Sequence, residues 1–191
     1  WLGFVKRIKF KYTVLILGVL VLADMWTIDK RYLNDSHFVT SKEYNRQFKP
    51  RPVDTEILTD KDPNYRVLDL TVNTFNDAVI SYFHKTIGGY SAAKLQRYQE
   101  MVDYHILPEM QQLIKSLQQS NSLESIDSTL AQLGALNMLN AKYIVINPNG
   151  MPLLNQSALG NAWFVTDYKF VNSPDEEILA LNSIDPAKTA V

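Results

Sequence analysis

The sequence predicts an α+β protein: a mainly antiparallel sheet packed with helices, preceded by one N-terminal transmembrane helix. Three observations lead to this prediction. A dense apolar run follows a basic cluster near the start, amphipathic stretches fill the middle, and short strand-like runs lie on either side of them. The order strand, helices, hairpin, strand, helix is typical of helices that cover an antiparallel sheet.

Length and composition narrow the possible functions. The chain has 191 residues, enough for one domain with a real core and an appendage, and its formal net charge of −1 argues against general nucleic-acid binding. It has no cysteine, which excludes disulfides, thiol catalysis and thiolate zinc sites. The sequence begins at Trp1 and its first methionine is Met25, so we expect a fragment of a longer protein.

The N-terminal region carries a membrane signal. The apolar run 13–23 follows directly after four cations: Lys6, Arg7, Lys9 and Lys11. Extended to 12–28, it would cover about 25 Å as a helix, with Tyr12 and Trp26 as interfacial anchors. Asp24 would then have to lie near the outer headgroups or face another helix.

Three interpretations of this run stay open: a spanning helix, a signal peptide with Val21 and Ala23 before its cleavage point, and a buried core helix. We favour the spanning helix. The basic cluster would then remain in the cytoplasm, and residues after about 28 would lie on the extracytoplasmic side of the cell membrane.

We therefore divide the chain into a basic flank and transmembrane helix (1–28), a connecting arm (29–64) and an extracytoplasmic α+β domain (65–191). The domain is expected to be incomplete at its C-terminus. The arm is interrupted by three prolines, Pro50, Pro52 and Pro63, and we expect a short helix in it at 55–58. Its Asp- and Asn-rich stretch 59–64 reads as a solvated turn rather than a calcium loop, because the EF-hand spacing is absent.

Within the domain we expect strands at 65–72, 142–147, 151–154 and 162–171. The turn 148–150 would join the second strand to the third. A helix would begin after the cap Ser91 and be interrupted at Pro108. A second would start at a capping box formed by Asn121 and Glu124 and run to about Asn140, and a third would start at Ser173–Pro174.

The stretch 81–101 is the strongest candidate for a binding site. Two glycines at its loop-to-helix junction indicate positive φ or close backbone approach. The cations beyond them suit an anion such as phosphate, and the aromatic rings suit a sugar. The candidate ligand-binding residues are His84, Lys85, Gly88, Gly89, Tyr90, Lys94, Arg97 and Tyr98. The alternative is a structural connection with packed tyrosines and solvated cations.

No sequence motif indicates metal binding, nucleophilic catalysis or nucleotide binding. The histidines His37, His84 and His105 lack metal-ligand spacing, and no nucleophile elbow, P-loop or dinucleotide fingerprint is present. We predict no metal, no cofactor and no catalytic residue in this chain. Tyr90, Tyr98, Asn161 and Trp163 would suit a sugar platform, although core and edge packing explains them equally well.

Several strings resemble one family. These are DMWTIDKRYLND (24–35), RVLDLTVNTFNDAVISYFHKTIGGYSAAKLQRYQEMVD (66–103), LNMLNAKYIVI (136–146) and ALGNAWFV (158–165), together with the C-terminal EEILAL and DPAKTAV. Together they resemble the YfhO-type family of bacterial multi-pass membrane proteins, similar to glycosyltransferases that use polyprenyl-phosphate sugars in the cell envelope. The chain lacks the family's many earlier helices and the early outer loop with its acidic catalytic residue, so whether it belongs to an enzyme stays open.

The resemblance implies an extracytoplasmic accessory domain that binds the carrier headgroup or an acceptor glycan, with the membrane and the rest of the parent protein as partners. An alternative is a non-catalytic domain that braces the membrane region or binds a partner. A third possibility is a secreted glycan-binding protein.

Overall fold

The computed structural model describes residues 9–46, 48–119 and 122–191. The chain forms two separate units, 1–47 and 48–191. Part of the expected basic cluster, Lys6 and Arg7, and the expected cap Asn121 lie outside the described residues.

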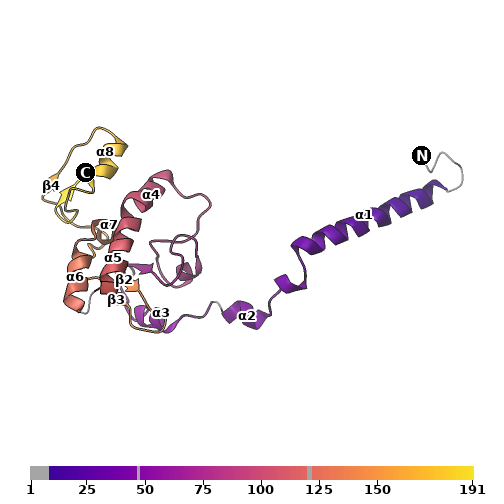
Figure 1. Cartoon of the computed structure of the whole chain (residues 1–191), viewed down its shortest axis with the longest axis horizontal. Helices are drawn as coiled ribbons and strands as arrows, with labels where there is room; N and C mark the ends of the chain where they lie inside the picture. The colour runs from indigo at the N-terminus through magenta and orange to yellow at the C-terminus, as the bar shows by residue number, and fades with distance from the viewer. Residues whose placement is uncertain (1–8, 47, 120–121) are drawn as a thin grey trace. The chain divides into compact units, whose positions relative to one another are not determined.

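The first unit is dominated by the predicted apolar helix. Helix α1 spans Phe10–Tyr32 and none of its residues is buried (Figure 1). The stretch 10–37 is long enough to cross a membrane and contains an 18-residue window with a mean hydropathy of 1.6. Within its own unit the helix is therefore not part of a buried core. A 3₁₀ turn at Asp35–His37, labelled η1, and helix α2, Ser41–Arg46, follow.

The second unit starts earlier than the sequence indicated. Helix α3, Pro52–Ile57, lies within the predicted arm, yet Val53 and Ile57 are fully buried beside Tyr65. Because these apolar side chains pack against the sheet, residues 48–64 belong to the compact unit and not to a free linker.

The main sheet has the order β1-β2-β3, from strands Arg66–Asp69, Ala141–Val145 and Leu153–Leu154. The mixed α and β composition is confirmed, but among the strand pairs of the described residues the expected antiparallel arrangement is met by β2 with β3 alone. Strands β1 and β2 are parallel, with Leu68 beside Ile144. Between them the chain makes a long helical crossover, and such a crossover permits parallel pairing.

The crossover contains the 3₁₀ turn η2, Val79–Tyr82, and, after the loop 83–95, one long helical run. Helix α4, Gln96–Met101, begins five residues after the predicted cap Ser91. It passes through the π-helical turn η3, Val102–Ile106, into α5, Leu107–Gln119. Pro108 therefore does not break the run, because the wider π turn just before it accommodates a residue without a backbone N–H.

The second predicted helix is divided in two. Helix α6 spans Leu123–Ala131, capped by the Ser122 hydroxyl, which accepts the Ser125 N–H. Helix α7 spans Gly134–Met138, and the break before it lies at Leu133, whose backbone is not helical. Sequence periodicity alone ran across this break, because Leu130, Leu133 and Leu136 all face the same core.

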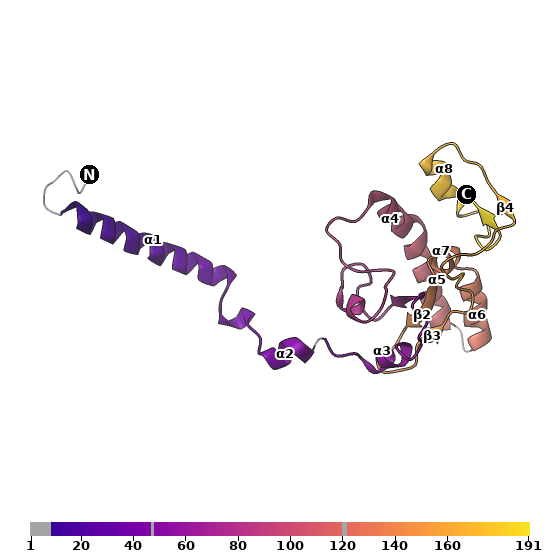
Figure 2. The same cartoon turned by 180° about the vertical axis from the view of Figure 1, so that it is seen from behind.

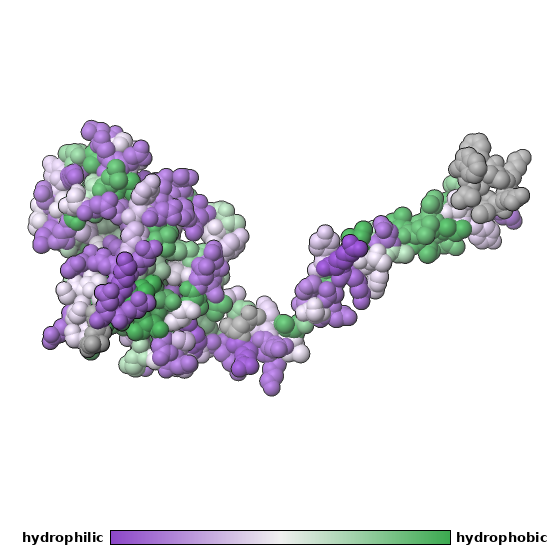
Figure 3. Space-filling model, in the orientation of Figure 1, coloured by the Kyte–Doolittle hydropathy of each residue, from purple (hydrophilic) through white to green (hydrophobic). Residues whose placement is uncertain are grey.

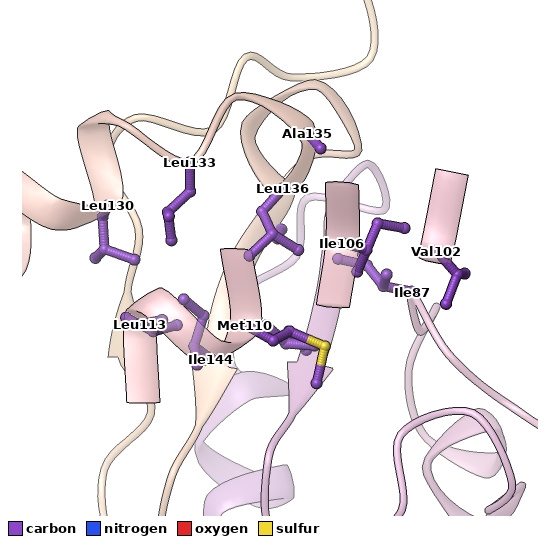
Figure 4. Close-up of a cluster of buried hydrophobic side chains, with 12 residues drawn as sticks. Ile87, Val102, Ile106, Met110, Leu113, Leu130, Leu133, Ala135, Leu136 and Ile144 are labelled. Atoms are coloured by element: carbon purple, nitrogen blue, oxygen red, sulfur yellow. The ribbon is translucent and has the colours of Figure 1, made fainter. Parts of the chain in front are cut away.

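Alternation along β1 sends neighbouring side chains to opposite faces of the sheet. Leu68 joins the larger core, which α5, α6 and α7 cover (Figure 4). Val67 joins a smaller core under α3. Asp69 points to the same side as Val67, and this placement brings a carboxylate to the α3 face.

The C-terminal segment holds less strand than predicted. Only Asp167–Tyr168 (β4) of the expected strand 162–171 is extended and paired, and it lies parallel to Thr189–Ala190 (β5). Helix α8, Pro174–Ala180, begins as predicted, with the Ser173 hydroxyl accepting the Glu176 N–H. This segment lies at the end of the domain opposite α3 (Figures 1 and 2).

Candidate functional site

The two glycines of the candidate stretch have the geometry that the sequence indicated. Gly89 has a φ of 108°, a conformation that L side chains rarely adopt. A Cβ at Gly88 would lie 1.8 Å from the carbonyl oxygen of Thr74, so no side chain fits there. The Gly89 N–H donates to that same oxygen at 2.7 Å. The pair therefore fixes the loop against the residues that follow β1.

The loop before the glycines lies along the outer edge of β1. The Val67 N–H donates to the Lys85 carbonyl at 2.8 Å, and the Ile87 N–H donates to the Val67 carbonyl at 3.2 Å. This pairing turns the His84 side chain inward, where it is fully buried. The Lys85 ammonium remains exposed and donates to the Pro63 carbonyl at 2.7 Å.

His84 meets a buried charge cluster that the sequence did not reveal. Its Nε2 lies 3.1 Å from Oδ1 of Asp54, a residue in the first turn of α3. The side chain of Asp54 is fully buried, and so is that of Asp69 on β1 except for 1% of its surface. One guanidinium serves both carboxylates: Arg51 bonds Asp54 through two nitrogens at 2.8 Å each and Asp69 at 2.7 Å.

The cluster is also tied to the backbone. Asp54 accepts the Arg51 backbone N–H at 2.8 Å, and Asp69 accepts the backbone N–H and hydroxyl of Thr71 at 2.7 and 2.6 Å. Arg51 in turn reaches the Thr71 hydroxyl at 3.3 Å. These bonds join the start of α3 to the end of β1. Nδ1 of His84, in contrast, is buried and has no hydrogen-bond partner among the described residues.

Burial and pairing act in opposite directions on the cluster's protonation. Burial alone would raise the pKa of Asp54, but the hydrogen bonds from Arg51 outweigh it, and the pKa is lowered. Burial lowers the pKa of His84, and the opposing bond to Asp54 does not restore it. The hydrogen bond with Asp54 raises the pKa of Arg51. At neutral pH Asp54 is therefore ionised, Arg51 is a cation and His84 is a neutral imidazole.

The remaining predicted residues lie in other settings. Tyr90 is 65% exposed, and the ammonium of Lys94 lies 5.3 Å from the centre of the Phe75 ring. Tyr98 packs against the larger core, and its hydroxyl donates to the Ile87 carbonyl. Arg97 points to solvent and pairs with Glu177 of α8 at 2.8 Å. The structure thus distributes the eight residues among an edge loop, a buried cluster, the core and an exposed ion pair.

The proposed sugar platform is distributed in the same way. The Trp163 indole N–H donates to the Pro186 carbonyl at 2.9 Å, while Asn161 accepts from the Asn140 amide at 3.4 Å. Trp163 and Asn161 line different cavities. Tyr90 and Tyr98 line neither of these two cavities.

The turn 59–64 is held by its own side chains and by β2. Asp60 accepts the Asp62 N–H at 2.9 Å, the Lys142 ammonium at 2.6 Å and the Tyr143 hydroxyl at 2.8 Å. The bond from Lys142 lowers the pKa of Asp60 to about 2, and burial with the Asp60 contact raises that of Tyr143 to about 12. Among the described residues no group of three or more His, Asp or Glu could hold a metal ion.

One cavity of about 370 Å³, which we call the C-terminal cavity, contains a predicted residue together with residues that sequence reasoning missed. Arg97, Glu100 and Glu177 contribute charge to its lining, and Trp163 with Val165 forms part of its apolar surface. Most of its other lining residues come from α8 and the C-terminal end: Pro174, Ile178, Leu181, Ile184, Pro186, Thr189, Ala190 and Val191. Sequence spacing could not join residue 97 to residue 177.

Chemically, the domain offers a cluster of mutually bonded, largely buried charges and a mainly apolar cavity whose lining includes three charged side chains. Comparison with family models, curated proteins and solved structures gave no match for this chain.

Proposed function

We propose that this chain is a membrane-anchored, non-catalytic accessory domain that braces or binds a partner on the extracytoplasmic side of a membrane. In this proposal α1 crosses the bilayer. At 1.5 Å per residue the helix is about 34 Å long, enough for a hydrocarbon core of about 30 Å. Lys30 and Arg31 lie in its last turn, followed by the arm to the domain.

The observation that carries the proposal is the contrast between this wholly exposed apolar helix and a domain whose buried charges serve internal bonds. An exposed apolar helix needs a membrane or a partner to cover it. Arg51 bonds both buried carboxylates, Asp54 and Asp69, so these charges hold α3 against β1, which suits a scaffold better than a reaction centre. The parent in this proposal is a glycosyltransferase-like protein of the YfhO type, which supplies the chemistry elsewhere.

The orientation can be tested because the chain contains no cysteine. Single cysteines at exposed Ser91 and at Lys9 would be labelled with a membrane-impermeant maleimide in intact cells. We expect Ser91→Cys to react in intact cells and Lys9→Cys only after permeabilisation. The reverse pattern would place the domain in the cytoplasm. Release of the chain from membranes by alkaline carbonate would show that α1 does not anchor it in the bilayer.

A second candidate function is binding of the polyprenyl-phosphate headgroup or an acceptor glycan. It is favoured by one observation, the position of Arg97 at the rim of the C-terminal cavity beside Trp163. Nanodiscs that contain polyprenyl phosphate should then bind the chain's domain and alter Trp163 fluorescence, and Arg97→Ala with Lys94→Ala should abolish the change. An unaltered response in this double variant leaves the bracing role as the function of the domain.

A further inference from the structure

The C-terminal segment presents apolar side chains on both of its faces. Trp163 and Val165 line the C-terminal cavity. The alternate residues point to solvent: Phe164 is fully exposed, Phe170 is 87% exposed and Tyr168 is 67% exposed. We call Phe164, Tyr168 and Phe170 the aromatic face.

The local structure does not cover this face. The β4–β5 sheet has two residue pairs, and the Tyr168 and Phe170 rings contact each other edge to face, with centroids 5.1 Å apart. Figure 3 shows apolar surface among polar surface in the part of the domain that holds α8 and β4. The aromatic face lies on the other side of the same segment from the cavity-lining Trp163 and Val165, and rings with this exposure are typical of an interaction surface.

The charged residues that line the cavity indicate the charge of the partner that it binds. Two of the three charged lining residues are carboxylates, Glu100 and Glu177, and the one cation, Arg97, is already bonded to Glu177. Glu100 accepts a hydrogen bond from the neutral Gln96 amide at 3.0 Å. Within the described ranges it meets no cation at ion-pair distance. Asp175 and Glu176 add exposed carboxylates in the first turn of α8.

We propose that the C-terminal cavity and the aromatic face bind a segment of a partner protein that carries an apolar anchor side chain next to a lysine or arginine. The anchor would enter the cavity, and the cation would meet Glu100. A concave cavity of this volume suits a side chain, and the surplus of carboxylates disfavours an anionic lipid surface. The inference rests on the proposed partner-binding role and gives it a location and a partner chemistry.

The test uses the full chain in nanodiscs of zwitterionic lipid. Changing Trp1 and Trp26 to phenylalanine leaves Trp163, in the cavity wall, as the one tryptophan. Two nine-residue probes are titrated, one alternating leucine with lysine and the other leucine with glutamate. We expect the leucine–lysine peptide to shift Trp163 emission saturably, and the leucine–glutamate peptide to bind at least about tenfold more weakly.

Two variants examine the two halves of the surface. Glu100→Lys should weaken the binding of the leucine–lysine peptide about fivefold. Glu124→Lys, the same change on exposed α6, should leave this binding unchanged. Phe164→Ser should weaken the binding of the leucine–lysine peptide about tenfold. Its matched control is Leu123→Ser, a change at an exposed residue of α6. All four positions are on the surface or at a cavity rim, so the fold is expected to persist and is checked by circular dichroism.

Equal binding of both peptides, or equal effects of a variant and its control, overturns the proposal. So does a Trp163 shift that appears with anionic nanodiscs in the absence of peptide, because that outcome identifies lipid as the occupant. These results do not depend on the cysteine-labelling experiment. A correctly oriented anchor with no peptide binding would refute the docking surface alone.

Discussion

Two arginines of the same domain, Arg51 and Arg97, show how differently one residue type acts in different surroundings. Arg51 joins two buried carboxylates from α3 and β1, and 23% of its side chain is exposed. Arg97 is 75% exposed and pairs with a single half-exposed carboxylate, Glu177. Removing one partner of a buried ion cluster is costly, while exposed pairs contribute little. The comparison teaches that burial, and not the number of nearby charges, decides which pair holds the fold.

The largest expected effect comes from Arg51→Met. This change leaves Asp54 and Asp69 buried without their shared cation, and we expect a loss of about 3 to 5 kcal/mol in the free energy of unfolding. Urea denaturation followed by circular dichroism measures it. A loss below about 1 kcal/mol would show that water or a rearranged side chain replaces the guanidinium, and the contrast between the two arginines would then disappear.

A smaller effect is expected from the protonation of His84. Its folded pKa is lowered, so between that value and the unfolded pKa of about 6.5 the unfolded state binds more protons. The stability contribution is therefore complete at pH 7.5 and falls as the pH drops below about 6.5. The slope from this one group is at most about 1.4 kcal/mol per pH unit.

Comparing the wild type with His84→Gln between pH 7.5 and 5.5 isolates this contribution, because the unfolded carboxylates titrate below that window. We expect a shallower pH dependence in the variant. Equal slopes in the two proteins would show that the imidazole is protonated in the folded state to the same extent as in the unfolded state.

The smallest effect is expected from Arg97→Met. The pair with Glu177 is solvent-exposed, so its loss should change the free energy of unfolding by less than about 1 kcal/mol. The difference between wild type and variant should shrink further in 1 M salt, where the Debye length is about 3 Å. A loss as large as that of Arg51→Met would mean that the attachment of α8 to α4 depends on this bond.

Some features were predictable because they depend on neighbouring residues. The apolar helix α1, the strand β2, the capped start of α8 and the glycine pair follow from local chemistry: hydropathy, a hydroxyl cap before proline, and residues without Cβ. The candidate site was predicted less well. Gly88 and Gly89 have the expected geometry, but Tyr98 and His84 turn inward, and Arg97 lies at a different cavity from His84.

The sequence by itself determined the apolar helix, the positions of the turns and the mixed α and β composition, because these depend on contacts within a few residues. Only the tertiary structure decided the parallel pairing of β1 with β2 and the burial of α3. The same holds for the meeting of Arg51 with Asp69 and of Arg97 with Glu177. Residues 18 and 80 positions apart meet only when the sheet and helices pack, and the burial of each pair then decides how much it contributes to stability.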